Sequence, residues 1–347
     1  MVEERKGYLD ILRALATVGV IVIHISANNW YGYIGSRDWI VFSIYEGICK
    51  VAVPIFFMIS GCLFLNSNRI RKISDLFVHS IRKLVIFLVF WSVIYKLLRF
   101  PGKRNLFIYL KHSLVEILEG NTETHLWFVY AIIGLYMLVP LLQLLVQYAD
   151  KKILLYGILI CVFFGSFCEF SEQVKGLAIV ANNLQKIRCG ISMGYIGYFL
   201  LGAYIDKYNI EEKFRKAICI LGMIGVLMSV GGVLLDCMLT RTLNERFWRY
   251  TTPGMYLGSI AVYLLFRNMR FDENDTMIKN LNKISTNSLG IYGIHFVFII
   301  IFWKIGFDTF LFSGVLSVPF ISLVVLLCSY ISTIGLKKIP WLGKYIA

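Results

Sequence analysis

Long apolar runs recur along the whole chain and are separated by short polar connections. Most are close to 20 residues, the length that an α-helix needs to cross a bilayer. Backbone polar groups in lipid must be paired within their own segment, so such runs predict helices. We expect about ten spanning helices, over residues 8–28, 41–65, 81–98, 125–148, 153–170, 189–206, 217–239, 251–267, 287–305 and 312–335. The pattern predicts an all-α polytopic membrane protein, a bundle forming a single transmembrane domain over 1–347.

Composition and charge support this class and orient it. The chain is 58% hydrophobic and only 16% charged, against about 25% charged residues in soluble domains. Basic residues gather at both termini and after the even-numbered spans, and the connection after residue 65 carries Arg69, Arg71, Lys72, Arg82 and Lys83. The positive-inside rule then places both termini in the cytoplasm. The net charge of +14 reflects this bias and contact with anionic lipid, rather than nucleic-acid binding.

Two further features add detail without adding chemistry. Leucine and isoleucine residues recur at helical spacing over 106–118, which predicts an amphipathic interfacial helix at the outer surface. The eight cysteines lie mostly inside spans and form no Cys-x-x-Cys pair, so we expect small buried side chains and no metal site.

The first predicted span carries polar residues on a single helical stripe. Asp10, Arg13, Thr17 and His24 share one face of an otherwise apolar helix, and His24 lies about three turns beyond Arg13. Ionisable side chains are costly in hydrocarbon unless they face a cavity or a partner. The stripe is therefore expected to face the interior, and it is where we expect the chemistry.

Other polar groups interrupt the later spans. Glu46 and Lys50 form an i, i+4 pair of opposite charge, and Pro54 follows them and predicts a kink near a cavity. Further candidates are His79 and Arg82 at the start of the third span, His125 and Trp127 at the start of the fourth, and Tyr292 and His295 in the ninth.

These segments resemble those of the acyltransferase family 3 membrane proteins. The resemblance is carried by the spacing from Arg13 to His24 and by four later segments in the same order. They are Val53-Pro-Ile-Phe-Phe-Met-Ile-Ser-Gly61, the basic start of the third span, His125-Leu-Trp-Phe-Val-Tyr130 and Ile291-Tyr-Gly-Ile-His295. The family's basic motif in the third span is usually Arg-x-x-Arg, and the matching positions here are His79 and Arg82.

The resemblance implies a ten-span O-acyltransferase of a bacterial plasma membrane. Such proteins transfer an acyl group, usually acetyl, from cytoplasmic acyl-CoA to a glycan, cell-wall polymer or lipid-linked acceptor. It implies a catalytic role for His24, as general base or as acyl carrier, and a catalytic or donor-binding role for Arg13. Phosphate contacts are expected from Arg82, Arg69 and Arg71. Acceptor contacts are expected from Glu46, His125, Trp127, Tyr292 and His295.

Two other functions stay open from the sequence. The membrane half of the vancomycin-resistance serine racemases resembles the same family and is associated with serine uptake, so a small-molecule transporter is one alternative. A non-catalytic membrane scaffold is the other. Single residues also have structural explanations: Arg13 could snorkel, Glu46 and Lys50 could neutralise each other, and the basic connections could act as topology determinants.

Overall fold

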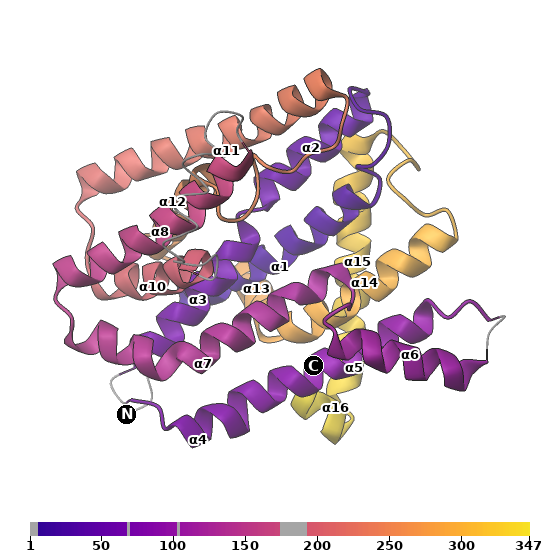
Figure 1. Cartoon of the computed structure of the whole chain (residues 1–347), viewed down its shortest axis with the longest axis horizontal. Coiled ribbons are helices and arrows are strands. Elements are labelled where there is room, and N and C mark those ends of the chain that lie inside the picture. The colour runs from indigo at the N-terminus through magenta and orange to yellow at the C-terminus, as the bar shows by residue number, and fades with distance from the viewer. Residues whose placement is uncertain (1–5, 68–69, 103–104, 174–192) are drawn as a thin grey trace.

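The computed structural model describes residues 6–67, 70–102, 105–173 and 193–347, and every regular element in those ranges is helical. Figure 1 shows the helices packed as one bundle. The elements are α1 (Gly7–Asn28), α2 (Arg37–Cys49), α3 (Ala52–Leu65), α4 (Ile73–Asp75), the π-helical η1 (Leu76–Ile81), α5 (Arg82–Leu98), α6 (Leu106–Leu118), the 3₁₀ turn η2 (Thr124–Leu126), α7 (Trp127–Tyr148), α8 (Lys151–Gln173), α10 (Met193–Lys207), α11 (Glu212–Thr240), α12 (Pro253–Arg267), α13 (Thr276–Thr286), α14 (Ser288–Lys304), α15 (Gly314–Lys337) and α16 (Pro340–Tyr345).

Helix α1 runs through the middle of the bundle and contacts α2, α3, α13, α14 and α15 (Figure 1). Most of its residues are buried, including the polar Asp10 and Thr17. A helix surrounded by other helices can carry ionisable groups, because its neighbours supply partners that lipid does not. This confirms that the polar stripe of the first span faces the interior.

The predicted second span is a broken helix. Helix α2 ends at Cys49 and α3 begins at Ala52, so the break falls at Lys50 and Val51. Pro54 has no N–H to donate to the carbonyl of residue 50, four positions earlier, which favours a break there. The helix is therefore interrupted near the position where Pro54 predicts a kink, beside the charged residues Glu46 and Lys50.

Helices α3 and α10 pack backbone against backbone. A Cβ atom at Gly61 would lie 1.8 Å from the Phe199 carbonyl oxygen, and one at Gly202 would lie 1.9 Å from the Met58 carbonyl oxygen. Small residues permit this close approach, which drives helix association in membranes where apolar burial gives no preference. The contact holds one face of α3, so its other face is available to line an interior space.

Six helical segments of the described residues are long and apolar enough to span a membrane. They are Gly7–Asn28, Arg37–Leu65, Ile73–Leu98, Thr124–Tyr148, Glu212–Thr240 and Gly314–Lys337. The pair α13 and α14, bent by 78°, makes a seventh if it counts as one span. Helices α8, α10, α12 and α14 coincide with the other predicted spans, although residues 189–192 lie outside the described ranges. The count of about ten and the cytoplasmic position of both termini stay predictions.

The helix predicted over 106–118 is confirmed as α6, and its position at the outer membrane surface stays a prediction. Its apolar residues Leu114 and Leu118 are exposed on the protein surface, as expected for a helix that turns one face to lipid. An ion pair between Glu116 and Lys96 ties α6 to the end of α5. Figure 1 shows α6 at the edge of the bundle, away from α11 and α12.

Candidate active site

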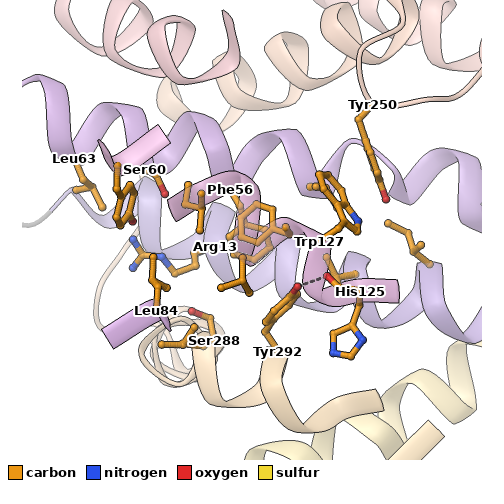
Figure 2. A pocket seen from close by; sticks show the side chains of 18 of the residues that line it. Arg13, Phe56, Ser60, Leu63, Leu84, His125, Trp127, Tyr250, Ser288 and Tyr292 are labelled. Atoms are coloured by element: carbon orange, nitrogen blue, oxygen red, sulfur yellow. Dashed lines mark hydrogen bonds between the residues drawn. The ribbon is translucent and has the colours of Figure 1, made fainter. Parts of the chain in front are cut away.

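A cavity of about 310 Å³ lies inside the bundle, with walls from α1, α3, α5, α7 and α14. Figure 2 shows Arg13, Ser60 and Ser288 at one end, and His125 and Tyr292 at the other. Most of the other lining residues are apolar: Val20, Ile23, Val53, Phe56, Leu63, Phe64, Leu84, Phe128, Val129, Ile132 and Leu289. The cavity therefore joins two polar ends through apolar walls.

A carboxylate orients the arginine at the first end. Arg13 Nη1 lies 3.4 Å from Asp10 Oδ1, one turn earlier on α1, and 3.5 Å from Ser285 Oγ of α13. Ser285 Oγ donates to the same Asp10 oxygen at 2.7 Å. Asp10 and Ser285 are buried, whereas 26% of the Arg13 side chain is exposed. The contacts hold the guanidinium while leaving it part-exposed in the cavity wall.

A second arginine lies beside the same end. The Arg71 guanidinium carbon is 4.6 Å from the ring centre of Phe64, which lines the cavity, and this ring packs 4.3 Å from Tyr136. Arg82 instead turns toward α16, where its Nη2 donates to Tyr345 Oη at 3.2 Å. Arg69 lies outside the described residues. Of the predicted donor-binding arginines, the structure thus brings Arg13 and Arg71 toward one mouth.

Three histidines meet at the second end. The ring centres of His24 and His125 are 5.8 Å apart, and the ring of His295 lies 5.3 Å from each of them. His24 and His125 line the cavity, and His295 packs behind them. His295 Nδ1 lies 2.7 Å from the Tyr292 carbonyl oxygen, while His295 Nε2 and both ring nitrogens of His125 are buried with no hydrogen-bond partner.

Tyrosines hold this histidine cluster (His24, His125 and His295) in place. The Tyr292 hydroxyl donates to the carbonyl oxygen of His125, which joins α14 to the start of α7. The Tyr95 hydroxyl of α5 donates to the Gly293 carbonyl oxygen at 2.6 Å, and its ring packs 5.0 Å from His125. Both tyrosine hydroxyls bind backbone carbonyls, so they position the cluster without occupying any imidazole nitrogen.

An aromatic pair lines the cavity close to the histidine cluster. The rings of Trp127 and Tyr250 stack with their centres 5.3 Å apart and an angle of 27° between them. Tyr250 comes from the segment between α11 and α12, and its carbonyl accepts a hydrogen bond from Tyr198 Oη at 2.6 Å. Figure 2 shows both rings at the histidine end.

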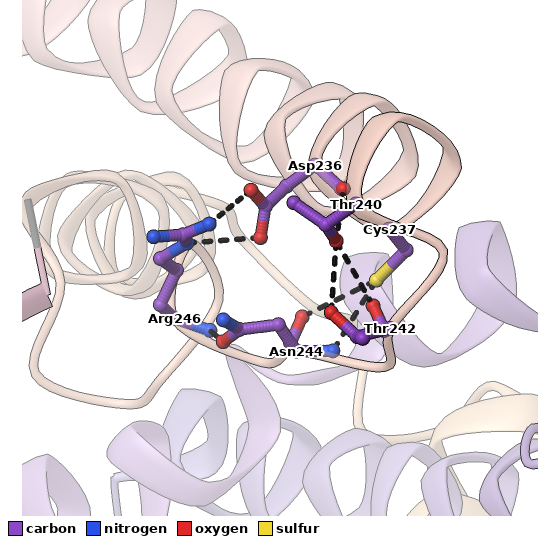
Figure 3. A network of polar contacts seen from close by, with 6 residues as sticks. All are labelled: Asp236, Cys237, Thr240, Thr242, Asn244 and Arg246. Carbon is purple, nitrogen blue, oxygen red and sulfur yellow. Dashed lines mark hydrogen bonds and ion pairs between the residues drawn. The ribbon is translucent and has the colours of Figure 1, made fainter.

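The segment that carries Tyr250 is fastened to the end of α11. Figure 3 shows Arg246 paired with both carboxylate oxygens of Asp236, with the Nε contact at 2.9 Å. In the same network the Asn244 N–H donates to Cys237 Sγ at 3.3 Å. A two-point arginine–carboxylate contact restrains both direction and distance, so the segment is held as it leads into Tyr250.

A buried ion cluster lies beside the aromatic pair. Lys50 Nζ is 3.0 Å from Glu46 Oε1 and 2.8 Å from Glu245 Oε2, and it lies 5.5 Å from the ring centre of Tyr250. Glu46 and Lys50 are almost fully buried. Neither is among the described residues that line the cavity.

Residues 6–334, nearly the whole chain, match the acyltransferase domain of acyltransferase family 3. The chain belongs to this family. The searches of curated proteins and of solved structures found no match. The family and the apolar helices together indicate a multi-pass membrane acyltransferase that lies in a lipid bilayer.

The cavity gathers half of the residues that the sequence singled out. Arg13, His24, His125, Trp127 and Tyr292 line it. His295 touches it only through its neighbours, Glu46 is paired with Lys50, and Arg82 points elsewhere. The roles predicted for all of these residues are untested and stay predictions.

Sequence reasoning missed several lining residues of the acyltransferase. Tyr250 is one, and its signal was the aromatic density of Phe247-Trp248-Arg249-Tyr250 in a short connection. Ser60, Tyr136 and Ser288 are others, each a polar group in an apolar helix. A single hydroxyl is common in spanning helices, so these residues gave no distinct signal.

Proposed function

We propose that this protein is an O-acyltransferase of the bacterial plasma membrane. In this proposal it transfers an acyl group, acetyl in the simplest case, from cytoplasmic acyl-CoA to a hydroxyl of a surface glycan, cell-wall polymer or lipid-linked acceptor. The observation that carries the proposal is the single cavity lined by both Arg13 and His24. One end suits an anionic donor, and the other offers imidazole nitrogens to a reacting group.

The arginine end suits the donor. Coenzyme A carries several phosphates on a long, thin and less polar arm. Arg13 and Arg71 supply cations at this end, whereas Arg82 on α5 is engaged with Tyr345. Guanidinium groups bind phosphate oxygens with paired hydrogen bonds. The apolar walls beyond Arg13 suit the arm, which would carry the thioester toward His24.

The histidine end suits the transfer step. His24 takes the proton of the acceptor hydroxyl as its oxygen attacks the thioester carbonyl. A carbon–oxygen bond forms, the carbon–sulfur bond breaks, and the proton passes from His24 to the leaving thiolate, which departs as coenzyme A. A two-step route through an acyl-histidine has the same balance and is equally compatible with this arrangement.

The aromatic pair suits a carbohydrate acceptor. Trp127 and Tyr250 both line the cavity beside the histidines, and the apolar C–H groups of a sugar pack well on aromatic side chains. His125 lines the same part of the cavity, and its two buried, unpartnered ring nitrogens would hydrogen-bond a sugar hydroxyl once the ring turned toward it. This supports a polyhydroxylated acceptor rather than an apolar one.

The proposal is tested by mass spectrometry of surface polymers from cells with and without the gene. Complementation with wild type should restore an acyl mass increment, and His24→Ala should reduce it by at least about a hundredfold, because general base catalysis contributes 10²–10⁴-fold. His112→Ala is the matched control, because His112 is exposed on α6. Wild-type acylation by a His24→Ala protein that is present in normal amount would refute the catalytic role.

A further inference from the structure

One ring nitrogen of His295 has a hydrogen-bond partner and the other has none. Its ring is fully buried, and its Nδ1 lies 2.7 Å from the carbonyl oxygen of Tyr292. A carbonyl can only accept, so the proton of the neutral imidazole is on Nδ1 and the lone pair is on Nε2. That Nε2 atom is buried without a partner. A buried acceptor left unpaired costs free energy, and such atoms in native proteins call for an explanation.

Two imidazoles have ring centres 5.3 Å from that of His295, and of these the ring of His24, tilted by 37°, is closer to the plane of the His295 ring than that of His125, tilted by 74°. This is a separation at which nitrogen atoms of two imidazoles reach each other at the usual hydrogen-bond distance of about 3 Å. The rings of His24 and His295 are tilted by 37° and His295 Nε2 has no partner as they stand, so a hydrogen bond between them forms when one of the rings turns. His24 is only half-buried and lines the cavity, whereas His295 does not line it.

We propose that His295 is a positioning residue that accepts a hydrogen bond from one ring nitrogen of His24. This fixes the His24 tautomer, so the other nitrogen presents its lone pair to the cavity. The chain of contacts runs from the Tyr292 carbonyl through His295 to His24. The inference rests on the proposed role of His24 as the base, and it names His295 as the group that keeps His24 in the tautomer able to accept the proton.

The chemical benefit of a histidine at this place follows from charge. When His24 takes the acceptor's proton it becomes an imidazolium with two N–H donors, and His295 Nε2 accepts one of them. A carboxylate would do the same, but it would leave an unpaired buried charge in the resting enzyme. In the described part of the chain, the rings packed on His24 are those of His125, His295 and Phe296, and none is anionic. A neutral acceptor avoids that cost.

Two substitutions separate positioning from packing. His295→Asn places an amide near the Nδ1 position, so it keeps a donor for the Tyr292 carbonyl and loses the acceptor at Nε2. His295→Gln reaches the Nε2 position with an amide oxygen, so it keeps an acceptor for His24. His112→Asn is the matched control on an exposed histidine.

The first measurement uses purified protein, radiolabelled acetyl-CoA and membranes of gene-deleted cells as acceptor. His295→Asn should lower kcat about tenfold to a hundredfold, within what general base catalysis contributes, with KM for acetyl-CoA unchanged. His295→Gln should retain kcat within about threefold. Added to His24→Ala, His295→Asn should cause no further loss, because residues acting as a unit are not additive. Equal losses in both His295 variants, or a raised KM alone, would overturn the positioning role.

The second measurement does not depend on catalysis. Nitrogen NMR of ¹⁵N-histidine protein in lipid nanodiscs reports the tautomer of each of the five histidines. His24 should be a single tautomer in wild type and His295→Gln, and a mixture in His295→Asn. Unchanged His24 signals, or a change at His125 alone, would refute the inference. If wild type transfers no acetyl group while His24 responds as expected, the proposed function fails and the hydrogen bond stands.

Discussion

Two buried polar clusters lie close together in this protein, and they are built in opposite ways. In the ion cluster, Lys50 is paired with Glu46 and Glu245 at 3.0 and 2.8 Å, and it lies off the cavity. In the histidine cluster, three of the nitrogens of His125 and His295 have no partner, and the cluster adjoins the cavity. The ion cluster pairs its lysine with its own carboxylates. The histidine cluster keeps ring nitrogens that could hydrogen-bond a ligand.

The difference indicates which buried polar groups hold the fold and which await a reactant. Buried charges persist when they are paired, and removing one partner leaves an uncompensated charge. Buried neutral nitrogens cost less when unpaired, so a protein can keep them ready beside a cavity. Tyr250 connects the ion cluster to the cavity wall, because its ring contacts Lys50 and stacks on Trp127. The ion cluster thus supports the wall of the site.

Lys50→Met should give the largest loss of stability. It leaves the Glu46 carboxylate buried and unpaired, which costs about 3–5 kcal/mol of unfolding free energy. Thermal unfolding in detergent measures this, with the exposed Lys151→Met as control. Adding Glu46→Gln to Lys50→Met should recover much of the loss. If Glu46→Gln alone instead raises the KM for acceptor without loss of stability, Glu46 binds the acceptor, as the sequence predicted.

Arg13→Ala should have the next largest effect, at the donor end of the cavity. Losing one charge-assisted contact costs about 1.5–3 kcal/mol, or roughly tenfold to a hundredfold in affinity for coenzyme A. Calorimetry on purified protein measures it. Arg82→Ala should weaken binding less, since Arg82 is engaged with Tyr345, and Arg99→Ala, whose partner is Glu123, is the control. Unchanged affinity after Arg13→Ala would leave Arg13 as a structural partner of Asp10.

Trp127→Ala tests the aromatic wall and should act on the acceptor alone. Loss of a stacking ring costs about 0.5–1.5 kcal/mol beyond the loss of buried area, which raises the KM for acceptor several-fold. Affinity for coenzyme A should stay at the wild-type value. Trp303→Ala, an exposed tryptophan on α14, is the matched control. A loss of donor affinity would instead place Trp127 on the donor path.

The smallest expected effect is a pH dependence from Glu245, in the connection between α11 and α12. Burial is the largest single influence and raises the pKa of this carboxyl, but the charge and hydrogen bond of Lys50, the Trp248 hydrogen bond and the Arg249 charge together lower the pKa below its ordinary value. Its stabilising contribution is therefore present above about pH 4.3, the unfolded pKa, and is lost as pH falls through the lower folded pKa. The contribution is below about 1 kcal/mol, because 41% of the side chain is exposed. As pH falls below about 4, the difference in unfolding temperature between wild type and Glu245→Gln should become smaller. A difference that does not change with pH would contradict this.

Relations within one helix were predictable from the sequence. The 3.6-residue period places Asp10, Arg13, Thr17 and His24 on one face whatever surrounds the helix, and the structure confirms that this face is internal. The break beside Pro54 was predictable for the same reason, because a missing N–H acts on its own turn. The amphipathic helix α6 also followed from local spacing.

Relations between helices were not predictable. His125 and His295 meet His24 only because α14 packs against α1 and the turn η2 before α7 brings His125 beside it, and many apolar helices of similar hydropathy leave that choice open. Tyr250 joins the cavity through a connection whose path depends on Asp236 and Arg246. Arg82 and Glu46 were predicted at the site, yet Tyr345 and Lys50 hold them elsewhere.

By itself, the sequence determined a helical membrane protein, its family, and one buried stripe with an arginine and a histidine, because hydropathy and helical period act locally along the chain. Only the tertiary structure decided that three histidines share one cluster, that the arginine and that cluster open into one cavity, and that the lysine is neutralised beside it. The physical reason is that every apolar helix face is about equally stable against lipid, so hydrophobicity does not select which helices pair. Helix partners are then selected by close contacts such as those at Gly61 and Gly202, and these appear only when the chain is folded.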